Sequence, residues 1–114
     1  MSPFVAARRP MAAAPLFAAL GDPTRLELVA RLSREGPRSI SALAEDSTIS
    51  RQAVTKHLEI LEEAGLTASR REGRERIFEL RPQRLAAAHR YLDQIGRQWD
   101  AAIDRLQAHL EKGR

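Results

Sequence analysis

Polar side chains near the middle of the chain are of the types that hydrogen-bond to nucleic acid. They lie at helical spacing, opposite an apolar stripe: Arg51, Gln52, Thr55 and Lys56. Arginine can form paired hydrogen bonds with guanine and glutamine with adenine, threonine can contact a thymine methyl group or a phosphate, and lysine binds phosphate. His57 adjoins the stripe and is interpreted as a packing or phosphate-contacting residue. An ordinary solvated helix can show the same residue types, so the neighbouring elements must decide between the two interpretations.

The neighbouring elements predict a helix-turn-helix. Ser41 can cap a short helix over residues 42–46, and residues 47–49 then form a turn. Ser50 can cap a longer helix over residues 50–64, and we count this serine among the DNA contacts. The apolar stripe of the longer helix consists of Val54, Leu58 and Leu61. The first turns of this candidate recognition helix should approach the base edges in a major groove.

A β-hairpin is predicted after Gly65, which ends the recognition helix. Its strands cover residues 66–71 and 76–80, and Gly73 supplies the positive φ of the connecting turn. One face of the hairpin is expected to point inward: Leu66, Ala68, Phe78 and Leu80. Arginines around the tip are expected to contact flanking phosphates or a narrow minor groove: Arg70, Arg71, Arg74 and Arg76. The alternative interpretation of this charge is an ordinary solvated turn.

The segments that precede the helix-turn-helix are predicted to be an arm, two helices and an extended stretch. Residues 1–14 are rich in Ala, Pro and Arg and predict a loose arm, and residues 15–20 predict a short helix. Asp22 and Pro23 indicate the start of a second helix, which should stop at the next Gly-Pro pair. Residues 38–40 predict an isolated extended segment.

One long helix is predicted from Pro82 to about Lys112. Its seam residues alternate steps of three and four, as in a coiled coil: Leu85, Ala88, Leu92, Ile95, Trp99, Ala102, Leu106 and His109. About 30 residues span roughly 45 Å, which is more than a domain this small can cover, and Gly96 is interpreted as a point of close backbone approach. We therefore expect a homodimer with these residues at its interface: Leu16, Leu20, Leu85, Leu92, Ile95, Trp99, Ile103, Leu106 and Leu110.

The composition limits the possible classes of function. The 114 residues carry a net charge of +4 and no cysteine, which fits a polyanionic partner and excludes disulfides and thiolate chemistry. The sequence shows no glycine-rich phosphate loop and no paired nucleophile and base, so we expect no enzyme. The apolar stretch near the start resembles a secretory signal only superficially, and no apolar run approaches the about 20 residues of a membrane span. We expect a cytoplasmic protein without a membrane partner.

In this order the elements predict a winged helix-turn-helix, a mainly α fold with a small β-hairpin wing. The sequence resembles the ArsR/SmtB family of winged-helix repressors over these stretches: Leu20–Arg25, Ser50–Leu58, Leu61–Leu66 and Arg70–Leu80. The resemblance implies a DNA-binding domain over residues 15–81, with its wing over 66–80, and a dimerisation helix over 82–112. It also implies a homodimer that binds double-stranded DNA at an inverted-repeat operator and represses by blocking polymerase.

Departures from the family pattern bear on regulation. Many relatives sense metals through a pair of cysteines in the stretch that is Leu43–Asp46 here. Other relatives hold zinc across the dimer on the last helix, whereas here the acidic and histidine residues lack that spacing: His89, Asp93, Asp104, His109 and Glu111. We expect neither a metal nor a cofactor, and the effector stays open. A metal- or small-molecule-responsive repressor and a winged-helix protein-interaction module are the alternatives.

Overall fold

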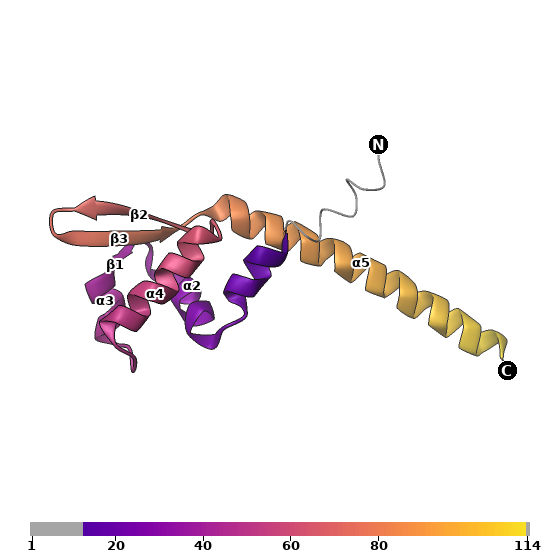
Figure 1. The fold of residues 1–114 in the computed structure, drawn as a ribbon. Coiled ribbons are helices and arrows are strands. Elements are labelled where there is room, and N and C mark those ends of the chain that lie inside the picture. Colours follow the sequence, from indigo (N-terminus) through magenta and orange to yellow (C-terminus); the bar gives the residue numbers. More distant parts are fainter. Residues whose placement is uncertain (1–12, 114) are drawn as a thin grey trace.

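A long helix projects from a small helical domain that carries a three-stranded sheet (Figure 1). The computed structural model describes residues 13–113. Most of the predicted arm over residues 1–14 therefore lies outside the described residues. The order of the named elements is α2, β1, α3, α4, β2, β3 and α5, and residues 13–20 are helical as well.

The predicted start signal at Asp22 is confirmed. Helix α2 (Pro23–Glu35) begins where Asp22 Oδ1 accepts hydrogen bonds from the backbone N–H groups of Thr24 (2.8 Å) and Arg25 (3.1 Å). Pro23 at the first helical position has no N–H that would need a partner. The helix ends at Gly36, whose φ of 79° lies in the left-handed region that favours glycine.

Two expectations about the next segment are wrong. Strand β1 (Arg38–Ser39) is not isolated, because it pairs antiparallel with β3. Ser39 rather than Ser41 caps α3 (Ile40–Glu45), and its Oγ accepts from the Ala42 backbone N–H at 3.0 Å. Ser39 has the extended backbone that an N-cap needs, since it also ends the strand.

Helix α4 (Arg51–Glu63) is capped at both ends as predicted. Ser50 Oγ accepts from the Ala53 backbone N–H at 3.1 Å. At the other end the N–H of Leu66 bonds to the carbonyl of Leu61 (3.0 Å), while Gly65 turns the chain with a φ of 82°. Between these caps the predicted stripe is buried: Val54, Leu58 and Leu61.

Strands β2 (Thr67–Glu72) and β3 (Glu75–Leu80) form the predicted hairpin, and the sheet order is β1-β3-β2. The two-residue loop has Gly73 at a φ of 61°. The register pairs Ser69 with Phe78 and Ala68 with Glu79, and paired residues share a face. Ala68 therefore does not point inward with Phe78, and this part of the prediction is wrong.

The core lies between the sheet and the helices. It joins α2, α3, α4, β3, the 13–20 helix and the first turns of α5 through these buried residues: Leu16, Ala19, Leu28, Leu32, Ile40, Leu43, Val54, Leu58, Leu61, Leu66, Phe78 and Ala88. The 13–20 helix also meets α5 through the rings of Phe17 and Tyr91, whose centroids are 5.7 Å apart. This packing places the 13–20 helix against α5.

Helix α5 (Pro82–Lys112) has the predicted bounds and extends well past the domain (Figure 1). Ala88 is its one buried residue, so the remaining turns pack little against this chain. None of the helices within residues 13–113 combines the length and apolar character that crossing a membrane requires.

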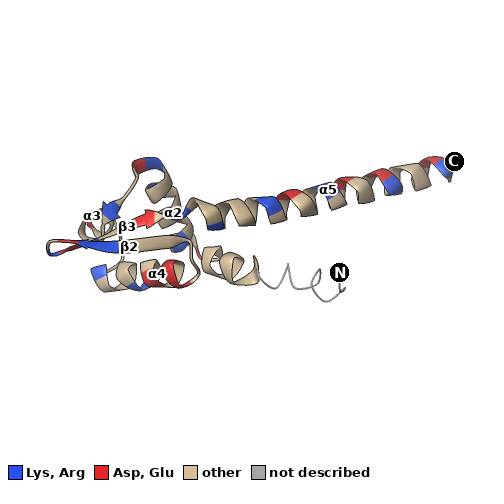
Figure 2. Cartoon of the chain, turned by 90° about the horizontal axis from the view of Figure 1, so that it is seen from above, with Lys and Arg blue, Asp and Glu red and all other residues tan. Residues whose placement is uncertain are grey.

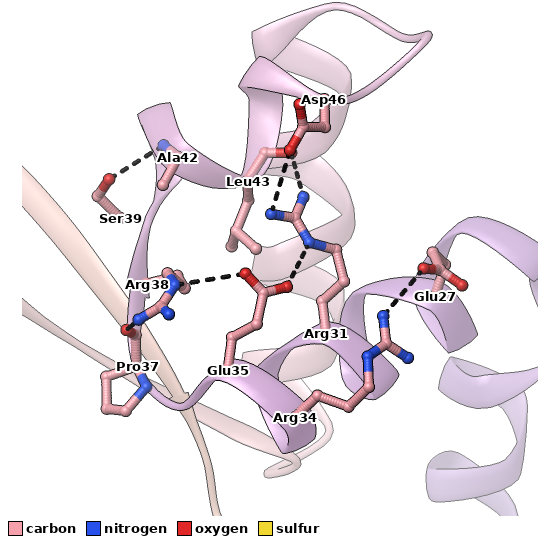
Figure 3. A network of polar contacts seen from close by, with 10 residues as sticks. All are labelled: Glu27, Arg31, Arg34, Glu35, Pro37, Arg38, Ser39, Ala42, Leu43 and Asp46. Carbon is pink, nitrogen blue, oxygen red and sulfur yellow. Dashed lines mark hydrogen bonds and ion pairs between the residues drawn. The ribbon is translucent and has the colours of Figure 1, made fainter.

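An ion-pair network anchored by Arg31 joins α2 to α3 and β1 (Figure 3). Arg31 Nη1 donates to the carbonyl of Leu43 at the end of α3 (3.1 Å), and Arg31 Nε donates to Glu35 Oε2 (3.0 Å). Asp46 Oδ2 lies 3.8 Å from Arg31 Nη2, and Glu35 Oε1 lies 3.5 Å from Arg38 Nε. The guanidinium thus satisfies a carbonyl that the short helix leaves free. The network holds the helix-turn-helix against α2.

We predict that Arg31→Met lowers the free energy of unfolding by about 1–3 kcal/mol, because Leu43 loses a charged hydrogen-bond donor. Arg31 is 15% exposed, whereas Arg34 and Glu27 in a neighbouring pair are 62% and 66% exposed. Glu27→Gln is therefore the control and should change stability little. Urea denaturation measures both variants, and equal effects would contradict the prediction.

The same network predicts acid sensitivity. The side-chain hydrogen bond from Arg31 holds the pKa of Glu35 below its ordinary value of 4.5. A carboxyl group whose pKa is lower in the folded than in the unfolded state stabilises the folded state at pH values above its unfolded-state pKa. This stabilisation is lost as the pH falls through the folded-state pKa. Urea denaturation between pH 6 and about pH 3 should therefore show a smaller loss of stability for Arg31→Met than for the wild type.

Candidate nucleic-acid interface

The N-terminal half of α4 presents the side chains predicted to read DNA. Arg51, Gln52 and Lys56 are exposed, and Thr55 is half-buried. Figure 2 shows basic residues towards the start of α4 and acidic ones towards its end. The acidic residues are Glu59, Glu62 and Glu63. The charge on α4 is therefore separated along the helix, with the basic end also holding the positive end of the helix dipole.

Short hydrogen bonds orient this basic end. Arg51 Nη1 donates to Ser41 Oγ of α3 at 2.8 Å, and Thr55 Oγ1 donates to the carbonyl of Arg51 at 2.9 Å. Ser50 Oγ is occupied as the helix cap. Arg51 keeps its other guanidinium nitrogens for a further partner. Gln52 and Lys56 stand exposed beside it.

The wing lies at the same end of the domain as the start of α4 (Figures 1 and 2). Three of the predicted arginines are exposed there: Arg70, Arg71 and Arg74. Arg70 pairs with Glu72 (3.3 Å) and Glu79 (3.4 Å), whereas Arg71 lies across from Arg76 on the sheet face that packs on the core. The register thus puts Arg70 and Arg71 on opposite faces of the wing.

Two further residues of the predicted site are engaged by protein groups: Arg76, which was expected to contact DNA, and His57, which was expected to pack or to contact a phosphate. Arg76 Nη2 donates to Glu62 Oε2 at 2.9 Å, and its guanidinium lies 4.8 Å from the centre of the Phe78 ring. His57 Nδ1 lies 3.2 Å from Arg25 Nη1. The structure therefore favours intramolecular roles for these two side chains. Their contact with DNA stays an untested prediction.

Glu62 is a residue that the sequence analysis missed. Its Oε1 accepts from the Ser69 backbone N–H (3.0 Å) and from Ser69 Oγ (2.7 Å), while Oε2 accepts from Arg76. Because β2 is an edge strand, the Ser69 N–H faces away from β3 and would otherwise need water. Glu62 thus fixes the base of the wing on α4. A glutamate on a helix face gives no sequence signal for such a role.

Helix α5 exposes the apolar face that was predicted to pair with a second chain. Its large exposed residues are Leu92, Trp99, Ile103, Leu106 and Leu110, with Trp99 65% exposed. Leu16 is different, because it is 2% exposed and belongs to this chain's own core. Leu20 and Leu85 pack partly against that core. The structure therefore favours a core role for Leu16, and its place at a dimer interface stays a prediction.

Two further expectations concern α5. A Cβ atom built on Gly96 meets nothing within 4 Å in this chain, so the reason for that glycine stays a prediction. Within the described range 13–113, no group of three or more histidine, aspartate or glutamate residues is placed to hold a metal ion.

Comparison with known proteins places the chain among transcriptional regulators. A family model described as a helix-turn-helix domain matches residues 20–70. The chain is 41% identical over 85 residues to an HTH-type transcriptional regulator of Mycobacterium tuberculosis, covering 75% of this chain and 76% of that protein. An ArsR-like transcriptional regulator from Rhodococcus sp. RHA1 has a TM-score of 0.72 and 37% identity, covering 85% of this chain and 91% of that chain.

A more distant neighbour shares the fold. It is the homodimeric winged helix-turn-helix DNA-binding domain of a possible ArsR-family regulator from Mycobacterium bovis. The TM-score is 0.61 at 22% identity, over 91% of this chain and 88% of that chain.

We predict that Glu62→Ala releases the base of the wing from α4. The Ser69 amide should then lose protection from hydrogen exchange by roughly ten-fold or more, since its acceptor is removed. Glu63→Ala is the matched control, because Glu63 is an exposed neighbour on the same helix. Exchange measured by NMR checks both variants. Unchanged protection of Ser69 in Glu62→Ala would show that the side-chain bond does not hold the wing.

Proposed function

Because this chain belongs to the ArsR/SmtB family of winged helix-turn-helix transcriptional regulators, we propose that it represses transcription as a homodimer on an inverted-repeat operator. One observation carries the proposal. The basic, exposed start of α4 and the arginines of the wing lie at one end of the domain (Figure 2). Regulation of this kind is exerted by binding alone and requires no catalytic step. A protein bound to chromosomal DNA would act in the cytoplasm.

Charge along α4 indicates how the helix would enter DNA. Phosphates attract the basic start of the helix and repel its acidic end, so the N-terminal turns should go deepest into the major groove. There, Arg51 would donate to guanine O6 and N7, and Gln52 would pair with adenine. Thr55 would touch a thymine methyl group or a phosphate. Lys56 would bind phosphate and add affinity without reading sequence.

The wing would add contacts beside the groove. Arg71 and Arg74 are exposed at and next to the hairpin tip. Arg70 is also exposed, but its pairs with Glu72 and Glu79 reduce the charge that it offers to DNA. Contacts of wing arginines with phosphates would release counterions, so this part of the affinity should fall steeply with salt.

A second copy of the chain would cover the exposed face of α5. That face runs from Leu92 to Leu110 and includes Trp99, Ile103 and Leu106. Monomeric proteins rarely leave so continuous an apolar surface in water. Pairing would place two copies of α4 in one assembly. Half-sites roughly 34 Å apart lie one helical turn apart on the DNA, so each copy of α4 would enter the major groove at its own half-site.

The DNA test begins with a duplex that the wild-type protein enriches from a random-sequence library. Arg51→Ala should cost about 1–3 kcal/mol of affinity for that duplex and relax the preference at one base pair. Lys56→Ala should weaken binding to selected and random duplexes alike. It should also reduce the salt slope, which is the magnitude of the slope of log binding constant against log salt concentration, by about 0.9. Fluorescence anisotropy at several salt concentrations measures both effects.

The control for this test is Arg97→Ala, which removes the same charge from an exposed position on α5. It should leave the affinity for the selected duplex nearly unchanged. A wild-type protein that binds selected and random duplexes equally well at physiological salt would contradict the proposed function.

The dimer prediction concerns Trp99→Asp combined with Leu106→Asp. Both side chains are more than half exposed in this chain, so the charges should not unfold the domain but should separate the subunits. Sedimentation equilibrium should then show a monomer at concentrations where the wild type is a dimer. Asp104→Lys changes the charge at an exposed position outside the apolar face and should remain dimeric. A double variant that stays dimeric would show that this face of α5 does not form the dimer interface.

A further inference from the structure

Arg25 joins three elements at the point where α4 meets the N-terminal part of the domain. Its Nε donates to the carbonyl of Ala19 in the 13–20 helix at 2.5 Å, and its Nη1 lies 3.2 Å from His57 Nδ1 on α4. Its own backbone N–H is bound by Asp22 at the start of α2. A single side chain therefore bridges the 13–20 helix, α2 and α4.

The chemistry of this bridge determines the role of His57. A guanidinium group can only donate hydrogen bonds, so Nδ1 of His57 is the acceptor in its contact with Arg25. Asp22 Oδ1 is 4.0 Å from the same nitrogen. The backbone hydrogen bond from Arg25 lowers the pKa of Asp22, which keeps that carboxylate ionised and unable to donate. Arg25 is thus the donor that holds the imidazole against α2.

The bridge lies between the helix that would form the dimer and the helix that would read DNA. The 13–20 helix packs on α5 through Phe17 and Tyr91, and Ala19 in that helix accepts the hydrogen bond from Arg25. His57 follows Lys56 on α4 but points towards α2 rather than outward. A displacement of the 13–20 helix would therefore be passed to α4 through a directional contact.

We infer that Arg25 and His57 are positioning residues that set the angle of the recognition helix relative to the dimer scaffold. The inference rests on the proposed function. Specific binding needs both copies of α4 to enter their half-sites together, so it depends on that angle. Binding to random DNA depends mainly on phosphate charge and tolerates a change of angle. Loss of the bridge therefore lowers specific affinity while it spares non-specific affinity.

The test compares His57→Leu with two isosteric variants, using the duplex enriched by the wild-type protein and a random duplex. His57→Leu removes the acceptor and should lower the ratio of specific to random affinity by roughly five-fold or more, with an unchanged salt slope. His57→Asn places an amide oxygen near the position of Nδ1 and should restore the ratio. His57→Gln places its amide near Nε2 and should not restore it.

A phosphate contact by His57 would give the opposite pattern. Binding to both duplexes would fall, the salt slope would change as in Lys56→Ala, and His57→Gln would be the variant that restores affinity. Thermal unfolding of each variant by circular dichroism excludes loss of folding as the cause. This pattern would overturn the inference while leaving the proposed function intact.

A double-mutant cycle tests the contact itself. Arg25→Lys keeps the charge but lacks the planar fork that spans Ala19 and His57. If the bridge acts as a unit, the effects of Arg25→Lys and His57→Leu on the affinity ratio should not add. Additive effects would overturn the inference. If the wild-type protein enriches no sequence from the library, the proposed function fails and the inference falls with it.

Discussion

Burial of one side of α4 is the constraint on which the rest of this structure depends. Val54, Leu58 and Leu61 are fully enclosed, and each such side chain contributes about 1.5–3 kcal/mol when removed from water. Because a helix repeats every 3.6 residues, this burial also fixes which side chains face outward. Ser50 and Gly65 limit the helix to one short segment. The outward side chains at the N-terminal end of α4 are therefore not needed for the core and stay exposed.

Three successive parts of α4 have different contacts. At the C-terminal end, Glu62 binds Ser69 and Arg76 of the hairpin. In the middle, His57 faces Arg25 of α2. At the N-terminal end, Arg51 is oriented by Ser41 and stays exposed. Contacts with the domain thus hold α4 along its length, while the side chains at its basic end stay exposed. The orientation of that end is therefore set by the folded chain before any partner binds.

Local signals in the sequence predicted most of the fold. Asp22, Ser50 and Gly65 mark helix ends through hydrogen bonds within a few residues, so their roles can be read without a structure. The choice between Ser39 and Ser41 could not be made in this way, because Ser39 becomes the cap by pairing in β1 with β3. Such a pairing joins residues far apart in sequence.

The candidate site was harder to predict because identical side chains have different surroundings. Arg51 and Arg76 look alike in sequence, yet Arg76 lies over Phe78 and donates to Glu62. Likewise, Leu16 and Leu106 are both apolar residues of helices, but Leu16 is buried in its own chain whereas Leu106 is exposed. Hydrophobic patterning indicates that a side chain will be buried. It does not indicate which chain will bury it.

The two edges of the sheet bear on aggregation. An open edge strand can recruit strands from other molecules, and this is a common start of aggregates. Here β1 is only a two-residue strand, and the Ser69 N–H on the β2 edge is already bound by Glu62. The β1 edge is therefore short, and the β2 edge has its Ser69 N–H occupied. The apolar face of α5 is the surface on which we propose that a second copy binds. One partner would bury that face, so assembly would stop at a dimer.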